Sequence, residues 1–327
     1  MRRPLAALLT ATALLLTAAC GGNSSNTNPP AAAASSGGPP DKVNVGVIAI
    51  LDVAPIYLGK QKGFFSKHNI DLTLTTAQGG AAIVPAVVSG QYQFGFSNVV
   101  SLLLANSNGL PLKIVCNGVN STGTAGNDYG AVMVKKDSPI KTAADLAGHT
   151  VAVNTLKNIG DTTTRAAVRK AGGDPTKVKF VEMPFPNMEA GLQGGQVDAI
   201  FVVEPFVSAA LAAGDRVLSS VYAEAAPNLT VATYFTSKQL TTSNPDLVKR
   251  FADAMKESLA YADAHGDEVR TAITTYTQIK ADQAAKLILP KWPAEVNKDS
   301  VQTLADLAKG DGLLAKPVNL TDLLPAS

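Results

Sequence analysis

Segments with the pattern of β-strands alternate with segments of helical spacing along most of this chain, and this alternation restricts the fold more than any other feature. Repeated strand–helix units predict an α/β fold in which neighbouring strands are parallel. The predicted strands are Val43–Ile48, Ile70–Thr75, Phe94–Phe96, Lys113–Cys116, Tyr129–Val134, Thr150–Val153, Val178–Glu182, Ala199–Val203 and Thr230–Thr236.

Helices are predicted between these strands and after the last one. Those between strands cover Pro55–Lys62, Ala81–Ser89, a segment starting at Val99, Ala143–Leu146, Gly160–Ala171 and Asn187–Gln193. Beyond residue 236 the pattern is helical, with Asn244 as a cap, Pro245 in the first turn, and further helices at 268–277, 282–289 and 300–309. Because this tail supplies only one strand, we expect it to return and cover the first part of the chain.

One local pattern occurs twice and indicates two similar halves. Gly90-Gln91 joins a predicted helix to the strand at Phe94, and Gly195-Gln196 joins another to the strand at Ala199, 105 positions later. The repeat favours two α/β lobes over one long sheet, although a helix–glycine–strand connection is also a common local device.

The first residues have the pattern of a secretory signal. Arg2 and Arg3 precede the apolar run Leu5–Ala19, which is too short to span a bilayer and ends in small residues before Cys20. We therefore predict a signal peptide at 1–19. The segment resembles bacterial lipoprotein signals, with Thr17 in place of the commonest leucine, and this implies acylation of Cys20. An ordinary signal that contains a cysteine is the alternative.

Residues 20–41 are predicted to form a lipid-anchored flexible linker. From Gly21 to Pro40 the segment has no charged, aromatic or large apolar side chain, so it cannot bury enough surface to order itself. A spacer of this kind would hold a folded body clear of a membrane. We expect an extracytoplasmic protein attached to the cell membrane by its N-terminal lipid.

Charge and motifs exclude several function classes. Arg2 and Arg3 account for the net charge of +2, so the rest of the chain carries as many acidic as basic residues. Without an excess of basic residues, nucleic-acid binding is not expected. Cys116 has no predicted disulfide partner and is expected to be buried rather than nucleophilic. The sequence shows no phosphate-binding loop, no Cys/His metal spacing and no complete nucleophile elbow, so we predict no catalytic residue, cofactor or metal.

Four stretches together resemble one protein family. The stretches are Val53–Leu72, Gly79–Asn98, Lys135–Val153 and Glu189–Phe206. Together they are similar to substrate-binding lipoproteins of ABC importers, from the nitrate, sulfonate, taurine and pyrimidine-precursor (thiamine precursor) group. The resemblance implies a two-lobed periplasmic-binding-protein fold of type II, with two hinge crossings near Asp128–Val134 and Leu229–Ser237 and a ligand cleft between the lobes.

The resemblance also implies domain boundaries and a role. Lobe I would comprise residues 42–130 and 231–327, and lobe II residues 131–230. The protein would be a monomer that captures a small organic solute and delivers it to the permease of an ABC importer. A ligand sensor or surface module with the same fold is an alternative. A pyrimidine-synthase-like enzyme is disfavoured because the chain lacks a cysteine cluster.

The expected ligand site lies where strands end and helices begin, because ligands of open α/β sheets bind there and helix N-termini present free N–H groups. Each glycine turn could equally be a tight connection. The candidate binding residues are Gly79, Gly80, Ala81, Ser97, Asn98, Asn154, Asn158, Gly160, Asp161, Thr162 and Asn187.

Two acidic residues at strand ends complete the predicted site. Asp52 either contacts the ligand or caps the helix that starts at Pro55, and Glu204 is expected to contact the ligand. Arg165 and Lys157 are the nearest candidates for an anion clamp, but neither is obviously placed for one. A sulfonate or taurine-like anion, an aminopyrimidine and an aromatic acid therefore all stay open as ligands.

Overall fold

The computed structural model describes residues 38–325, and the chain divides into one unit that ends at Gly38 and another that starts at Pro39. The helices and strands of residues 38–325 belong to the second unit. The predicted signal peptide, the acylated Cys20 and the linker as far as residue 37 lie outside the described residues.

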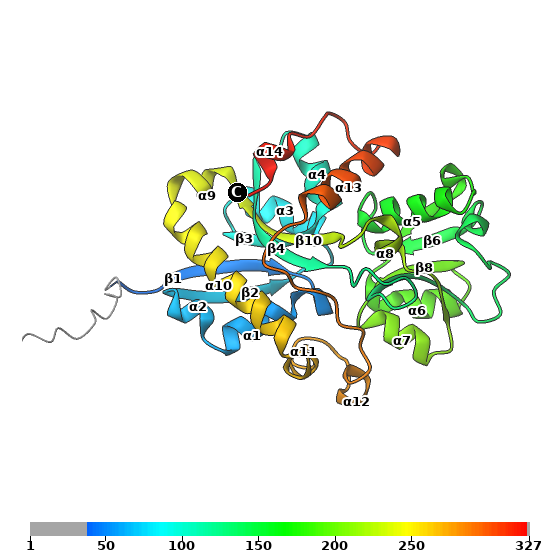
Figure 1. The fold of residues 1–327 in the computed structure, drawn as a ribbon, viewed down its shortest axis with the longest axis horizontal. Coiled ribbons are helices and arrows are strands. Elements are labelled where there is room, and N and C mark those ends of the chain that lie inside the picture. The colour runs from blue at the N-terminus through cyan, green and yellow to red at the C-terminus, as the bar shows by residue number, and fades with distance from the viewer. Residues whose placement is uncertain (1–37, 326–327) are drawn as a thin grey trace, which may run out of the picture. The chain divides into compact units, whose positions relative to one another are not determined.

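Two five-stranded sheets organise the structure. Figure 1 shows several of their strands among the helices. The first has the order β2-β1-β3-β10-β4 and the second has the order β7-β6-β8-β5-β9. The strands of the first sheet are β1 (Asp41–Val47), β2 (Ile70–Thr76), β3 (Phe94–Asn98), β4 (Leu112–Asn120) and β10 (Thr230–Ser237). Those of the second are β5 (Gly130–Val134), β6 (Thr150–Val153), β7 (Lys179–Glu182), β8 (Ala199–Val203) and β9 (Arg216–Ser219).

The two sheets have the same topology. In each, a central strand (β3 or β8) lies between a parallel strand and an antiparallel one. The expected parallel pairing is therefore right for one side of each sheet and wrong for the other, where β10 and β5 run antiparallel to their neighbours. Gly90 and Gly195 precede the two central strands, and both have positive φ (79° and 70°). The repeated Gly-Gln turn therefore uses the same left-handed glycine conformation in both sheets.

Helices connect and cover the strands. The longer ones are α1 (Ala54–Gln61), α3 (Gly80–Val88), α4 (Val99–Ser107), α5 (Ile159–Lys170), α6 (Phe185–Gln193), α7 (Phe206–Ala212), α10 (Pro245–Ala264), α11 (Gly266–Ile273) and α13 (Lys298–Gly310). The shorter ones are α2 (Phe64–Lys67), α8 (Val221–Ala225), α9 (Lys238–Ser243), α12 (Ala281–Ala284) and α14 (Leu320–Leu323), together with the 3₁₀ turns η1 (Leu51–Val53), η2 (Ala143–Leu146) and η3 (Pro175–Lys177).

Side-chain caps fix where several helices begin. Asn98, Asn158 and Asn244 accept backbone N–H groups in the first turns of α4, α5 and α10, respectively. Pro245 follows its cap at the first helical position, as the sequence predicts.

The chain passes between the sheets twice, and both passages come earlier than expected. β5 lies wholly in the second sheet and β10 wholly in the first, so residues 121–129 and 226–229 make the crossings. The two passages contact each other, since Ser121 N donates to Leu229 O at 2.9 Å. Asn120, the last residue of β4, also donates from Nδ2 to Asn228 O at 3.1 Å. Strands β5 and β10 are extended and fully buried, which explains why sequence alone could not separate them from the crossings.

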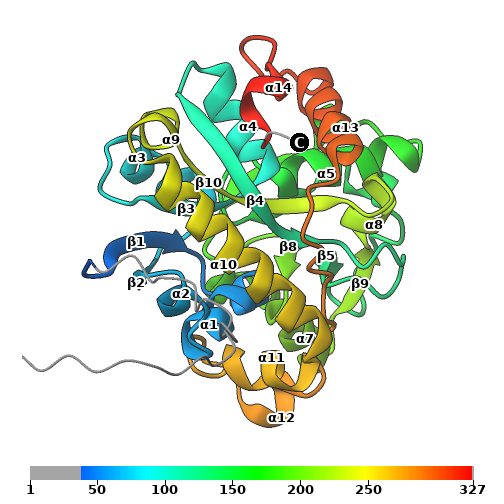
Figure 2. The ribbon, with the colours of Figure 1, turned by 60° about the vertical axis from the view of Figure 1, so that its left-hand side comes forward.

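The C-terminal tail returns to the first sheet, as expected. β10 lies between β3 and β4, and α10 packs beside α1 (Figure 2). Trp292, in the segment before α13, is buried and its Nε1 donates to Asp52 O at 3.2 Å. α13 contacts both α4 and α5, so the tail also reaches the second half.

Candidate functional site

The carboxyl ends of strands from the two sheets meet. Gln78 Nε2 donates to Asn154 O at 3.1 Å, and Asn154 Nδ2 donates back to Gln78 O at 3.4 Å. The segments that leave these strand ends are 48–52 after β1, 77–79 after β2, 154–158 after β6, 183–184 after β7 and 204–205 after β8. In open α/β sheets this edge is where ligands bind.

A small cavity, here called the inner cavity, lies where these ends meet. Its volume is about 30 Å³, which is room for about two water molecules. Polar residues from both sheets line it: Asp52, Asn98, Asn154, Asn158 and Tyr222. Apolar residues, among them Phe96, Phe185 and Phe201, form the rest of its wall.

Asp52 is a buried carboxyl group at this cavity. The residue is 2% exposed, and Tyr129 Oη donates to Oδ2 at 3.3 Å. Oδ1 is buried and has no hydrogen-bond partner. Burial raises the pKa of Asp52 to about 7. Asp52 does not cap α1, whose first residue follows Val53 without a side-chain cap, so that alternative is wrong.

The asparagines of the cavity are held by neighbours. Asn98 Oδ1 accepts Ser101 N at 2.9 Å, and Asn158 Oδ1 accepts Gly160 N at 2.9 Å. Asn158 Nδ2 donates to Asn154 Oδ1 at 2.8 Å, which links the cap of α5 to the end of β6. These amides are therefore fixed in position at the cavity wall.

The start of α3 approaches the second sheet without a side-chain cap. A Cβ added at Gly79 would lie 2.8 Å from Thr155 Cγ2 and 3.0 Å from Asn154 Nδ2. A Cβ at Gly80 would lie 2.0 Å from Ser97 Oγ, within the first sheet. Gly79 therefore keeps the two edges close, whereas Gly80 is required by local packing. Ala81, the next residue, is exposed.

The first turn of α5 contains its own carboxyl group. Asp161 Oδ2 accepts Lys157 N at 2.9 Å, while Asp161 Oδ1 and Thr162 Oγ1 are buried without partners. Burial raises the pKa of Asp161 to about 6. Gly160 is packed against the ring of Phe201, 2.6 Å from where a Cβ would lie.

Glu204 is fully buried, and both of its carboxylate oxygens have partners in the protein. Oε1 accepts Ser208 Oγ at 2.7 Å and Ile288 N at 3.0 Å, and Oε2 accepts Ser208 N at 3.0 Å. Its backbone O accepts Leu51 N at 3.0 Å. Burial raises the pKa of its carboxyl group. Glu204 thus ties β8 to the loop after β1 and to the C-terminal tail.

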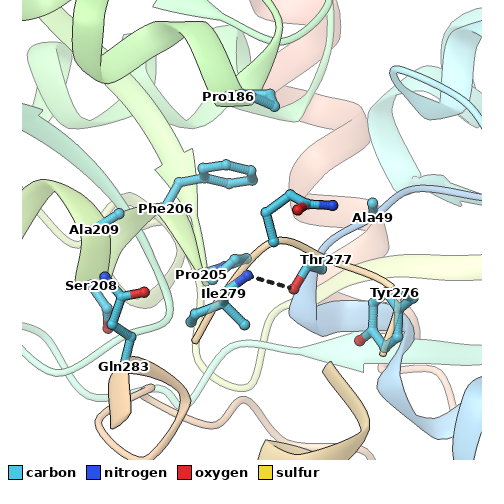
Figure 3. Close-up of a pocket in the computed structure, with 11 residues that line it drawn as sticks. Ala49, Pro186, Pro205, Phe206, Ser208, Ala209, Tyr276, Thr277, Ile279 and Gln283 are labelled. Carbon is cyan, nitrogen blue, oxygen red and sulfur yellow. Dashed lines mark hydrogen bonds between the residues drawn. The ribbon is translucent and has the colours of Figure 1, made fainter. Parts of the chain in front are cut away.

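A larger, mostly apolar cavity lies beside the same strand ends and is here called the outer cavity (Figure 3). Its volume is about 350 Å³. Phe206 at the start of α7 and Tyr276 after α11 stand on opposite sides of it in this view. The remaining lining residues are Ala49, Pro186, Pro205, Ser208, Ala209, Thr277, Gln278, Ile279 and Gln283.

A stacked pair of rings contributes one ring to the wall of each cavity. Phe185 lines the inner cavity and Phe206 lines the outer one, and their ring centroids are 5.5 Å apart with planes 17° from parallel. Ala49 of the outer cavity lies between Ile48 and Ile50 of the inner one in sequence. The two cavities are therefore adjacent parts of one cleft.

The structure thus brings together four of the residues expected from sequence, Asp52, Asn98, Asn154 and Asn158. The others line neither cavity: Gly79, Gly80, Ala81, Ser97, Gly160, Asp161, Thr162, Asn187 and Glu204. Arg165 points its guanidinium at Pro175 O, 2.6 Å from Nη1, and over the ring of Phe180. Sequence reasoning missed Tyr222, Tyr276 and Ile279, which lie outside all four family-like stretches, and it missed Phe206, which ends one of them.

Metal-binding clusters and membrane-spanning helices are both absent from residues 38–325. No group of three or more His, Cys, Asp or Glu side chains in this part of the chain is arranged to hold a metal ion. No helix within the same range combines the length and apolar character that crossing a membrane requires. Cys116 is buried, and burial raises the pKa of its thiol.

Comparison with known sequences gives a family match and a relative. The family model described as "NMT1/THI5 like" matches residues 50–269. The taurine-binding periplasmic protein of Escherichia coli (strain K12) is 28% identical over 228 residues, which are 68% of this chain and 68% of that protein.

Solved structures share the fold. The periplasmic aliphatic sulphonate binding protein SsuA from Escherichia coli has a TM-score of 0.70 at 21% identity, covering 86% of this chain and 96% of that one. The ligand-binding component of an ABC-type import system from Staphylococcus aureus has a TM-score of 0.75 at 14% identity, covering 87% and 96%. The fold is thus the two-lobed fold of periplasmic binding proteins, as the sequence predicts.

Proposed function

Since the chain belongs to the NMT1/THI5-like family, we propose that it is an extracytoplasmic solute-binding protein that captures a small organic solute and delivers it to an ABC importer. The Escherichia coli relative is named for taurine binding, and the two structural neighbours for sulphonate binding and for ABC-type import. All three names describe binding, so the proposed role is capture and release of the solute without chemical change.

The observation that carries the proposal is the convergence of equivalent strand ends on one polar cavity. Asp52 and Asn98 come from the first sheet, and Asn154 and Asn158 from the second. A solute bound there would contact both halves at once, so its binding would favour the arrangement in which the halves are close.

Admission of a solute requires the cleft to widen. The inner cavity holds only about 30 Å³, whereas small-molecule sites are typically about 300–1,000 Å³. The crossings at 121–129 and 226–229 are the segments about which the halves would rotate. We propose that the structure represents a nearly closed arrangement.

The candidate residues enter this proposal in two groups. The four that line the inner cavity would contact the solute directly. The others would come near the solute only as the cleft widens: Gly79, Gly80, Ala81, Ser97, Gly160, Asp161, Thr162, Asn187 and Glu204. Charge-assisted hydrogen bonds contribute about 1.5–3 kcal/mol each, so three or four suffice for the roughly 8 kcal/mol of micromolar binding.

The remaining parts of the proposal concern location and organisation. Residues 1–19 would be removed as a signal peptide, and acylated Cys20 with the linker to residue 41 would hold the protein at the membrane, next to the importer's permease. Lobe I would comprise 42–130 and 231–327, and lobe II 131–230, in a monomer. The membership of β10 in the first sheet and of β5 to β9 in the second supports this division to within a residue, since Asp41 already belongs to β1, Gly130 to β5 and Thr230 to β10.

Thermal-shift and calorimetric titration test the proposal. We expect at least one member of a panel of sulfonates, nitrate, aromatic acids and thiamine precursors to raise the melting temperature, because a ligand that binds only the folded state stabilises it. Asn158→Ala should weaken that binding about tenfold, whereas Asn108→Ala, at the exposed end of α4, should not. A panel without any binder, or equal affinities for the two variants, would contradict the proposal.

A further inference from the structure

Helix α13 contacts both halves of the molecule outside the cleft. It packs against α4, which follows β3 of the first sheet, and against α5, which follows β6 of the second. Figures 1 and 2 show α13 beside these helices. No residue from 297 to 311 lines the inner or the outer cavity. This part of the C-terminal tail therefore connects the two halves without taking part in the candidate binding site.

Hydrogen bonds before and after α13 hold the tail to the first sheet. Asn297 N donates to Thr230 Oγ1 at 2.9 Å, and Thr230 N donates to Ser300 Oγ at 3.0 Å, which fastens the start of α13 to β10. Beyond the helix, Lys113 Nζ of β4 donates to Asp322 O at 3.0 Å. If the two halves moved apart, α13 would therefore stay with the first sheet and separate from α5.

An ion pair joins the end of α13 to α5. Arg169 Nη2 contacts Asp311 Oδ1, and the side chain of Asp311 is only 4% exposed. Because burial of the carboxylate reduces screening by water, the attraction is stronger than in a fully exposed pair. Arg169 belongs to the second half and Asp311 follows a helix that is held to the first, so this pair must break when the halves separate.

The polar groups around this ion pair are incompletely satisfied. Asp161, Arg165 and Arg169 are spaced four residues apart and lie on one face of α5. Burial, helped by the negative charge of Asp311, raises the pKa of Asp161 to about 6. Asp161 Oδ1, Arg165 Nε and Asp311 Oδ2 are all buried without hydrogen-bond partners, which is costly. Separation of α13 from α5 would let water reach these groups and offset part of the energy lost with the ion pair, so the contact is suited to opening and closing again.

We propose that residues 297–311 form a strap that holds the two halves together independently of the solute, with the Arg169–Asp311 pair as its latch. This inference rests on the proposed function, which requires the cleft to open. Because the strap contributes no residue to either cavity, it stabilises the close arrangement whether or not a solute occupies the cleft. The C-terminal tail then determines which fraction of the molecules is open and can admit a solute.

Solution scattering of the chain without added solute tests the strap. Arg169→Ala and Asp311→Asn should each have a larger radius of gyration than the unaltered protein. The ratio of open to closed molecules should rise at least about fivefold, the factor for a loss of about 1 kcal/mol. Combining the two substitutions should raise this ratio little further, because both remove the same pair. A purely structural role for the pair would lower the melting temperature of the variants and leave their radius unchanged.

Lys67→Ala is the matched control. It removes an ion pair with Glu257, 3.0 Å long, that joins α2 to α10 within the first half, and it should leave the radius of gyration unchanged. An unchanged radius in both Arg169→Ala and Asp311→Asn, or an equal increase in Lys67→Ala, would overturn the inference. Since no solute enters this comparison, that result leaves the proposed function intact. A solute panel without any binder would contradict the proposed function, and scattering would still decide whether the strap exists.

Discussion

Gln78 and Asn154 exchange hydrogen bonds across the meeting edges of the two sheets. The side-chain amide of Gln78 donates to the backbone of Asn154, and the side-chain amide of Asn154 donates to the backbone of Gln78, at 3.1 and 3.4 Å. Asn154 also lines the inner cavity and accepts from Asn158. This contact between the two halves is therefore continuous with the candidate binding site.

Removing the side-chain amide of Gln78 should favour the arrangement in which the two halves are apart. Gln78 is exposed, so Gln78→Ala is expected to change the free energy of unfolding by less than about 0.5 kcal/mol. The lost hydrogen bond, about 0.5–1.5 kcal/mol, should instead weaken solute binding roughly 2- to 12-fold. Titration of Gln78→Ala beside Gln91→Ala, an exposed glutamine away from the cleft, checks this. Equal affinities would show that the exchange does not contribute to closure.

A single added methyl group at Gly79 should hold the edges apart. Gly79 has extended backbone (φ −170°), which alanine adopts without strain, but its Cβ would meet Thr155 and Asn154. We expect Gly79→Ala to melt within a few degrees of the unaltered protein, to bind solute at least tenfold more weakly, and to show a larger radius of gyration in solution scattering. Gly310→Ala, where a Cβ meets nothing within 4 Å, is the control. Unchanged affinity and radius would argue against close approach at this position.

Much of the fold could be predicted because local patterns determine it. The predicted strands at 150–153 and 199–203 have the observed bounds, since each is a short apolar run between turn residues. β9 was missed because Arg216–Ser219 is an edge strand of only four residues, mostly half-buried, with no clear alternation. α7 and α8, on either side of it, were missed as well.

The candidate site could be predicted only where it depends on strand ends. Asp52, Asn98, Asn154 and Asn158 follow strands, so topology alone places them together. Tyr276 reaches the outer cavity because the C-terminal tail returns over the first sheet, and its ring stacks on that of Tyr57 with centroids 3.9 Å apart. No local sequence pattern specifies a contact over that separation, so this part of the cleft had to come from the structure.

An ion pair between α5 and the end of α13 should stabilise the folded chain more than its other surface pairs. Arg169 Nη2 contacts Asp311 Oδ1, and the side chain of Asp311 is only 4% exposed with its second oxygen already unpartnered. Arg169→Ala leaves this carboxylate without its cation, and we expect a loss of about 1–3 kcal/mol in the free energy of unfolding. Lys177→Ala, which breaks an exposed pair with Asp174, should cost less than about 0.5 kcal/mol. Urea unfolding of both variants measures the difference. Equal losses in the free energy of unfolding would show that the Arg169–Asp311 pair does not stabilise the fold more than an exposed pair.

Stability should fall as the pH rises through the neutral range. Burial raises the pKa of Asp52 to about 7 and that of Asp161 to about 6, from an ordinary value of 3.8. Between pH 4 and 7 the folded chain therefore holds protons that the unfolded chain has released, so the stabilisation present below about pH 4 is lost as the pH passes 6 and then 7.

The variant Asp52→Asn isolates the larger share of this dependence. Each unit of pKa shift corresponds to about 1.4 kcal/mol, so the carboxylate of Asp52 destabilises the empty protein by up to about 4 kcal/mol at pH 8. Asp52→Asn should be more stable than the unaltered protein at pH 8 and nearly equal to it at pH 4, with the slope that Asp161 contributes still present. Urea unfolding at pH 4, 6 and 8 measures how the free energy of unfolding depends on pH in the unaltered protein and in the variant. Parallel curves for the two proteins would mean that Asp52 is ionised in the folded state at its ordinary pKa, with a donor or water at Oδ1.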